Sequence, residues 1–86
     1  MTWVCVHIPQ APISKAVNRA FYNLLKHENA LQGGLSPPVY CQSSPNGDGL
    51  RYFFSAEAAA RYAKLLEEWA AYEVEQPPLE LMTRVL

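Results

Sequence analysis

The sequence contains few cysteines, little net charge and no long apolar run. Two cysteines in 86 residues are too few for the disulfide scaffold of a small secreted protein. The formal net charge is −1, whereas strong, sequence-independent binding to nucleic acid requires an excess of basic residues. No apolar stretch is long enough to cross a bilayer. The apolar N-terminal stretch has no basic start and ends at Pro9, unlike a signal peptide. These absences predict a cytoplasmic protein with reduced thiols and no membrane association.

Sequence motifs of catalysis are also missing. The chain has no Gly-rich phosphate-binding loop, no nucleophile elbow, no metalloprotease helix and no close pair of carboxylates within an apolar run. We therefore expect a protein that has no enzymatic activity and binds no cofactor. A small enzyme whose active site forms between two copies of the chain is an alternative, because such a site leaves no motif in the sequence.

What the chain does contain is a high apolar content in regular patterns. Half of its residues are hydrophobic and 12% are aromatic, and its length is that of one domain with one small core. Residues 2–8 alternate in a β-branched run before Pro9, which predicts a strand. From residue 13 to residue 31 apolar side chains recur three, four or seven apart, which predicts a helix that ends at Gly33 and Gly34. The apolar stripe of that helix consists of Ile13, Val17, Ala20, Phe21, Leu24 and Leu31.

The second half of the chain begins with a predicted hairpin. Residues 38–43 and 49–54 are strand-like, and the segment between them is rich in proline, asparagine, aspartate and glycine, which favour turns. Ser55 can accept hydrogen bonds from the first turn of a helix, and an apolar arc predicts that this helix runs from residue 56 to about 71. Residues 72–76 alternate again and stop at Pro77 and Pro78, which predicts a fourth strand.

The order strand, helix, strand, strand, helix, strand predicts a ferredoxin-like α+β fold. Its right-handed crossovers place both helices on one face of a four-stranded antiparallel sheet. We expect residues 1–78 to form this single domain and residues 79–86 to form a C-terminal appendage. The helix-covered face should carry Val4, Val6, Ile8, Leu50, Tyr52, Phe54 and Val74. The open face should carry Trp3, Cys5, His7, Tyr40, Gln42, Arg51, Phe53, Glu73 and Glu75.

Aromatic side chains beside an arginine on the open face predict a binding surface, since proteins seldom leave such a patch in water. A second copy of the chain or the C-terminal segment could cover this face. A stacking platform for the bases of a single nucleic-acid strand is the alternative. Aromatic residues and arginine are enriched at protein interfaces. The residues that we expect to contact a partner are Trp3, Tyr40, Arg51 and Phe53.

A separate basic group bears on the nucleic-acid alternative. Lys15, Arg19 and Lys26 fall on one side of the first predicted helix, at about 100° per residue, with Tyr22 among them. This side of the helix points away from the open sheet face, so the four residues would form a second site. Binding of single-stranded nucleic acid through them stays the main alternative to protein binding.

A metal or reactive-thiol site is a less favoured alternative. Cys5 and His7 share one face of a predicted strand, and Cys41 could lie on a neighbouring strand. A structural zinc site usually shows a tight pair of ligands, and the sequence has none. Buried thiols and an ordinary histidine are the favoured interpretation, and we expect no metal.

The C-terminal segment is too apolar for an idle tail, because five of its eight residues are large and apolar. Pro77 and Pro78 stiffen its exit from the domain. We predict that it packs across a homodimer as an extra strand or helical turn, with docking on its own domain as the alternative. The residues that would hold the dimer are Leu79, Leu81, Val85 and Leu86.

The short chain, the aromatic face, the apolar segment and the lack of catalytic motifs favour one functional class. We expect a small intracellular interaction module, an adaptor, regulator or inhibitor, that acts by binding another protein without catalysis.

Overall fold

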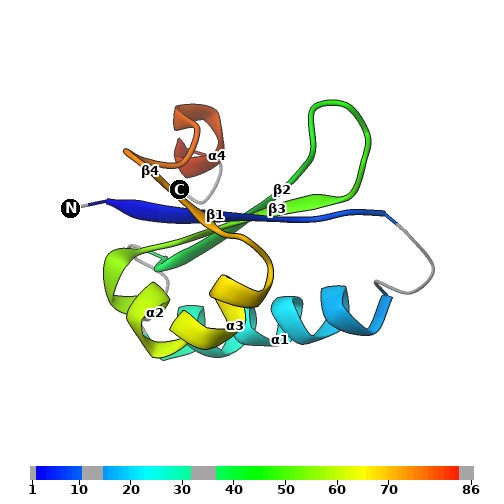
Figure 1. Cartoon of the computed structure of the whole chain (residues 1–86). Helices are drawn as coiled ribbons and strands as arrows, with labels where there is room; N and C mark the ends of the chain where they lie inside the picture. Colours follow the sequence, from blue (N-terminus) through cyan, green and yellow to red (C-terminus); the bar gives the residue numbers. More distant parts are fainter. Residues whose placement is uncertain (1, 11–14, 32–36, 84–86) are drawn as a thin grey trace.

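The computed structural model of the protein describes residues 2–10, 15–31 and 37–83. A four-stranded antiparallel sheet has the order β2-β3-β1-β4. Its strands are β1 (Trp3–Ile8), β2 (Val39–Ser43), β3 (Leu50–Phe54) and β4 (Tyr72–Val74). Helices α1 (Lys15–Leu31), α2 (Ala56–Arg61) and α3 (Ala63–Glu68) cover one face, and α4 (Leu79–Thr83) lies on the other (Figure 1). The predicted ferredoxin-like α+β fold is confirmed. Within the described ranges, no helix is long and apolar enough to span a membrane.

The core between the sheet and the three helices confirms the predicted helix-covered face of β1 and β3. The ring of Phe21 lies at its centre, 5.2 Å from the Tyr52 ring and 6.1 Å from the Phe54 ring between centroids. The predicted helix start at Ile13 and the stop at Gly33 and Gly34 lie outside the described residues. The buried members of this core are Val6, Ile8, Phe21, Val39, Tyr52, Phe54, Ala58, Ala59 and Leu66.

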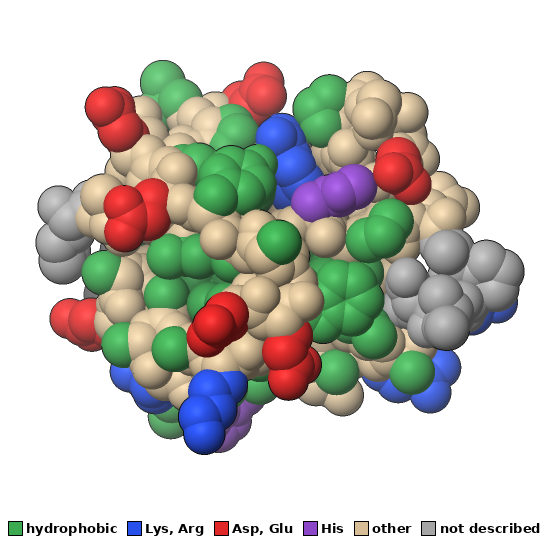
Figure 2. Space-filling view, in the orientation of Figure 1, with side chains coloured by type: hydrophobic (Ala, Val, Ile, Leu, Met, Phe, Trp, Pro, Cys, Tyr) green, Lys and Arg blue, Asp and Glu red, His purple; other side chains and the backbone are tan. Residues whose placement is uncertain are grey.

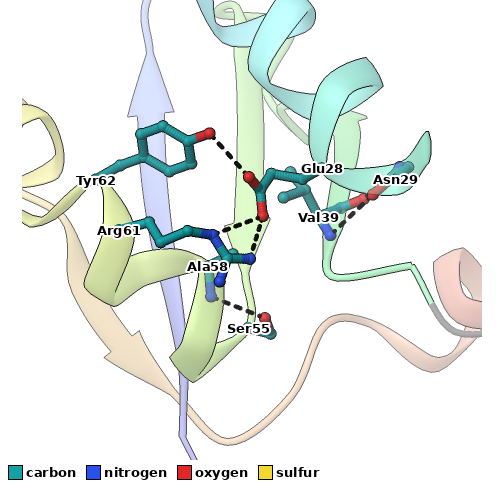
Figure 3. A network of polar contacts seen from close by, with 7 residues as sticks. All are labelled: Glu28, Asn29, Val39, Ser55, Ala58, Arg61 and Tyr62. Carbon is teal, nitrogen blue, oxygen red and sulfur yellow. Dashed lines mark hydrogen bonds and ion pairs between the residues drawn. The ribbon is translucent and has the colours of Figure 1, made fainter. Parts of the chain in front are cut away.

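The second predicted helix is in fact two helices, and the prediction of one continuous helix to residue 71 is wrong. The break falls at Tyr62, whose φ of −120° is not helical. Both Arg61 and Tyr62 reach one carboxylate on α1, that of Glu28 (Figure 3). Consecutive residues of a regular helix point about 100° apart, which would keep the side chains of Arg61 and Tyr62 from reaching the same carboxylate. The break at Tyr62 accompanies the contact of both side chains with Glu28.

Glu28 is the one buried charged side chain among the described residues, with 1% of its surface exposed. Its Oε1 accepts hydrogen bonds from the Arg61 guanidinium, one of them 3.1 Å long from Nε, and its Oε2 accepts one of 2.9 Å from the Tyr62 hydroxyl. The hydrogen bonds from Arg61 hold the pKa of Glu28 below its usual range, although burial acts in the opposite direction. This contact joins α1 to the junction between α2 and α3.

Helix α3 ends in a hydrogen-bond pattern that normally uses glycine. The N–H of Ala71 donates to the Leu66 carbonyl and the N–H of Ala70 donates to the Glu67 carbonyl, which is the Schellman arrangement. The residue at its left-handed position is Ala70, with φ +54°. The chain therefore leaves the helix before residue 71 and enters β4 at Tyr72.

The predicted facing of β4 is wrong. Val74 pairs with Trp3, and Glu73 pairs with Val4, so Val74 lies on the face opposite the three helices and Glu73 on the helical side. Strand β4 has only three residues, and a shift of one residue reverses every side chain of a strand. On its actual face Val74 packs against a second buried cluster, which includes Leu81 of α4.

Residues 79–83 of the C-terminal segment form the short helix α4, which packs on the sheet of its own chain. The N–H of Leu81 donates to the Pro78 carbonyl, which starts α4 directly after the two prolines. Leu81 is 7% exposed and joins a second cluster on the predicted open face. Leu81 therefore docks on its own domain, which was the alternative to packing across a homodimer. The buried residues of the second cluster are Cys5, Tyr40, Phe53 and Leu81.

Candidate functional site

Strand β2 is one of the two edges of the sheet, and the direction of its backbone groups follows from its pairing with β3. The N–H of Ser55 donates to the Pro38 carbonyl at 2.8 Å, and the N–H of Ser44 donates to the Gly49 carbonyl at 2.9 Å. In an antiparallel pair the hydrogen-bonded residues alternate along the strand. Residues 38, 40, 42 and 44 therefore turn their backbone groups toward β3. Val39, Cys41 and Ser43 turn theirs outward.

The side chain of Asn29 on α1 closes the first of these outward positions (Figure 3). The Val39 N–H donates to Asn29 Oδ1 at 3.3 Å, and Asn29 Nδ2 donates to the Val39 carbonyl at 3.1 Å. The amide thus makes the two bonds that a neighbouring strand would make. At Cys41 and Ser43 the outward N–H and carbonyl groups have no hydrogen-bond partner within the described part of the chain. We call these two positions the open edge.

Two pockets flank the open edge. The larger one, which we call the Tyr22 pocket, has a volume of about 440 Å³ and lies between α1, β2 and α4. The smaller one, the Asn18 pocket, has a volume of about 270 Å³ and lies where α1 meets the β2–β3 hairpin. Residues lining the Tyr22 pocket are Tyr22, Leu25, Asn29, Pro37, Val39, Tyr40, Cys41 and Leu81. Residues lining the Asn18 pocket are Gln10, Asn18, Ser43, Gly47, Gly49 and Leu50.

Both pockets are electrically neutral. None of the lining residues is Asp, Glu, Lys, Arg or His, and burial raises the pKa values of the Cys41 thiol and the Tyr40 hydroxyl, so both stay protonated near neutral pH. Two charged side chains lie beside lining residues: Lys26 Nζ lies 5.6 Å from the centroid of the Tyr22 ring, and Asp48 Oδ1 accepts a hydrogen bond of 3.2 Å from the N–H of Gln10, which lines the Asn18 pocket. This site can form hydrogen bonds and bury apolar groups.

The four residues predicted to contact a partner do lie together, but α4 covers half of them. Tyr40 is 7% and Phe53 is 3% exposed, whereas Trp3 and Arg51 are half-buried. The rings of Trp3 and Tyr40 are 5.7 Å apart, and the Arg51 guanidinium lies 5.7 Å from the centroid of the Phe53 ring. Of the four, only Tyr40 also lines the Tyr22 pocket.

The predicted basic group does share the exposed side of α1. Lys15, Arg19, Tyr22 and Lys26 are all exposed, Tyr22 to 53%. Figure 2 shows that most basic side chains visible from this direction lie along the lower margin, over the helical layer. Tyr22 therefore belongs both to this basic group and to the lining of the Tyr22 pocket.

The less favoured metal set is not brought together. Cys41 pairs with Tyr52 and packs against the helical side, whereas Cys5 lies in the second cluster on the other face. Among the described residues no group of three His, Cys, Asp or Glu side chains is placed to hold a metal ion. His7 Nε2 contacts the Asp48 carbonyl and lies 4.0 Å from the Asp48 carboxylate, which ties the hairpin loop to β1.

The four residues predicted to hold a dimer are divided. Leu81 is buried on its own sheet and Leu79 is 68% exposed, while Val85 and Leu86 lie outside the described residues. The open edge itself was missed from the sequence. The signal for it was present: β2 reads Val-Tyr-Cys-Gln-Ser, without the charged residues that commonly protect an edge strand.

Comparisons with protein-family models, with curated proteins and with solved structures found no match for this chain. The functional argument therefore starts from the open edge and its two pockets.

Proposed function

We propose that the protein is a non-enzymatic interaction module, an adaptor, regulator or inhibitor, that binds an extended segment of another protein along the edge of β2. The observation that supports this most directly is the pair of outward backbone positions at Cys41 and Ser43, beside two neutral pockets. Strand addition of this kind obtains affinity from backbone hydrogen bonds and specificity from pockets for alternate side chains. The open edge is short, because the Asn29 side chain already forms hydrogen bonds with the outward N–H and carbonyl of Val39.

The energetics favour a weak to moderate complex. Two residues with open N–H and carbonyl groups offer up to four backbone hydrogen bonds, each worth about 0.5–1.5 kcal/mol net. An apolar side chain buried in the Tyr22 pocket adds about 1.5–3 kcal/mol. Part of this gain is offset by the ordering of the bound segment.

A library of displayed ten-residue peptides, selected on the full-length protein, tests the proposal. Bound peptides should slow hydrogen exchange of the Cys41 and Ser43 amides. Ser43→Pro removes one outward donor while leaving the Gln42 and Ser44 bonds to β3 in place, so it should weaken binding about tenfold. Ser43→Ala removes the same side-chain hydroxyl but keeps the N–H, so it should weaken binding much less than Ser43→Pro does. Selected peptides that leave both amides unprotected would refute the proposal.

A second candidate function is binding of single-stranded nucleic acid along the exposed side of α1. The exposed residues Lys15, Arg19, Tyr22 and Lys26 support it. Affinity for a labelled oligonucleotide should then fall steeply as salt rises, because neutralised phosphates release counterions. Lack of binding at low salt would exclude this function.

Two further parts of the proposal concern assembly and location. A homodimer through residues 79–86 stays a prediction, supported among the described residues by the exposed Leu79. A location in the cytoplasm also stays a prediction, supported by the free thiols Cys5 and Cys41.

A further inference from the structure

Helix α1 presents a row of four side chains along the edge of β2. Asn18, Tyr22, Leu25 and Asn29 are spaced four, three and four apart, which places them on one side of the helix. Asn29 holds Val39, Tyr22 and Leu25 line the Tyr22 pocket, and Asn18 lines the pocket next to Ser43. The row therefore changes from apolar to polar in the direction from Cys41 to Ser43.

The register of an added strand fixes which of its side chains meet this row. Hydrogen-bonded partners in an antiparallel pair point to the same face, and Cys41 faces the helical side because it pairs with Tyr52. Ser43 faces the same way, two residues along. A bound residue opposite Cys41 therefore turns toward Tyr22 and Leu25, and the bound residue opposite Ser43 turns toward Asn18.

The Asn18 amide has an unmet hydrogen-bonding requirement. Its Oδ1 is buried and has no hydrogen-bond partner in the described part of the chain, while its backbone carbonyl accepts from the Tyr52 hydroxyl at 3.4 Å. A buried acceptor without a partner destabilises the protein unless a donor reaches it. Asn18 lines the pocket next to Ser43, so a turn of its side chain toward that pocket would let a hydroxyl or amide side chain on a bound segment supply the donor.

We infer that the segment bound at β2 carries a large apolar side chain opposite Cys41 and, two residues away, a hydrogen-bond-donating side chain such as Ser or Thr opposite Ser43. This inference rests on the proposed function and specifies its ligand. The apolar residue fills the Tyr22 pocket, and the donor satisfies Asn18 Oδ1.

A second copy of β2 fits this site poorly. In antiparallel self-pairing, Cys41 would face another Cys41 or Ser43, and neither side chain is large enough to fill a pocket of about 440 Å³. Pairing about a two-fold axis would also place two α1 helices side by side. The exposed charges of α1 are basic, and its one acidic residue, Glu28, is buried. The occupant is therefore a segment of another protein, and acidic residues flanking it are favoured.

Peptide variants and protein variants together test the two preferences. Peptides are taken from the displayed library and retained only if they protect the Cys41 and Ser43 amides. In these peptides, Thr→Val at the donor position should weaken binding about three- to tenfold, since the two side chains differ in the hydroxyl. Asn18→Ala should abolish that difference and leave the apolar preference intact. Asn23→Ala, an exposed change on the same helix, is the matched control and should alter neither.

The apolar preference has a separate readout. Replacing the large apolar residue of the peptide by Ala should weaken binding at least tenfold, and Tyr22→Ala should reduce that factor without affecting the Thr over Val preference. Peptides that protect both amides but show neither preference would overturn this inference and leave the proposed function standing. Absence of any peptide that protects the amides would overturn both. Protection that rises with protein concentration alone would identify a second copy as the occupant and overturn the inference.

Discussion

Ala70 holds a backbone conformation that favours glycine. Its φ of +54° costs an L-residue about 1–2 kcal/mol, and its side chain is exposed, so glycine there loses no packing. Glycine also loses more freedom on folding, roughly 0.5–1 kcal/mol. Ala70→Gly should therefore raise the free energy of unfolding by about 0.5–1 kcal/mol, measured by urea denaturation. The same substitution at exposed Ala60 inside α2 is the control and should lower it by about 1 kcal/mol. An equal decrease in the free energy of unfolding for Ala70→Gly and Ala60→Gly would contradict the expected relief of backbone strain at Ala70.

The contact between Glu28 and Arg61 predicts a dependence of stability on pH. The pKa of Glu28 is lowered in the folded protein, chiefly by hydrogen bonds from Arg61. A carboxyl group with a lowered pKa stabilises the fold above its unfolded pKa of about 4.3, and this contribution is lost as pH falls through the folded value. In Arg61→Gln the largest cause of the lowering is removed, while burial and the hydrogen bond from Tyr62 remain, so the pKa of Glu28 should rise.

The difference in stability between the native protein and Arg61→Gln should thus be largest near pH 7 and shrink as pH falls through the lowered folded pKa of Glu28, below which Glu28 is protonated in both proteins. Urea unfolding at a series of pH values measures it. Arg19→Gln, an exposed change on the outer side of α1, should give an offset that does not vary with pH. Parallel curves for the native protein and Arg61→Gln would show that the contact does not control the titration of Glu28.

At the scale of elements, the β2–β3 hairpin depends on a close approach of its loop to the end of β1. A Cβ atom on Gly49 would lie 2.0 Å from the Ile8 carbonyl oxygen and 2.8 Å from the Gln10 nitrogen, and its φ is +86°. Gly47 has a similar φ of +77° but no atom within 4 Å of such a Cβ. A side chain at Gly47 would meet only the cost of a positive φ, whereas a side chain at Gly49 would meet that cost and a steric clash with the end of β1.

We expect Gly47→Ala to lower the free energy of unfolding by about 1–2 kcal/mol, the cost of the left-handed conformation. Gly49→Ala should cost about 1–3 kcal/mol more, because the loop must move away from β1. Thermal and urea unfolding of both variants provide the comparison. If the two substitutions cost the same, the close approach to β1 is not a constraint on the fold.

The elements also differ in how far the sequence alone predicts them. Local chemistry determines the hairpin, through its turn residues, and α2, where Ser55 Oγ accepts from the Ala58 N–H at 3.3 Å as expected. The facing of Val74 depends instead on the register of a three-residue strand against β1, which no local pattern specifies. The break at Tyr62 accompanies a hydrogen bond to Glu28, a residue 34 positions away, which no local pattern specifies.

The same distinction applies to the candidate site. The aromatic cluster was predicted from alternation, and its members do share a face. Its cover by α4 required knowledge of where residues 79–83 dock. The open edge requires more still, since the outward direction of Cys41 and Ser43 follows only from the hydrogen-bonded pairs, and the closure of Val39 follows only from Asn29.

At the scale of the whole molecule, α4 has one buried and one exposed side. Leu81 covers the cluster on its own sheet, whereas Leu79 is 68% exposed. Among the described residues of the C-terminal segment, Leu79 is the exposed large apolar side chain, and we expect it to be the one that bridges two chains. The predicted homodimer and the observed docking of Leu81 are compatible if the two leucines serve different partners.

Substitution of each leucine separates these two roles. Leu79→Glu should convert a dimer into a monomer in light scattering, because an unpaired carboxylate is costly to bury in an apolar interface, while stability of the single chain changes little. Leu81→Ala should instead lower the free energy of unfolding by about 2–3 kcal/mol, because Cys5, Tyr40 and Phe53 lose their cover, and the oligomeric state should be retained. A full-length protein that is monomeric at high concentration, or a dimer unaffected by Leu79→Glu, would assign α4 to its own domain alone.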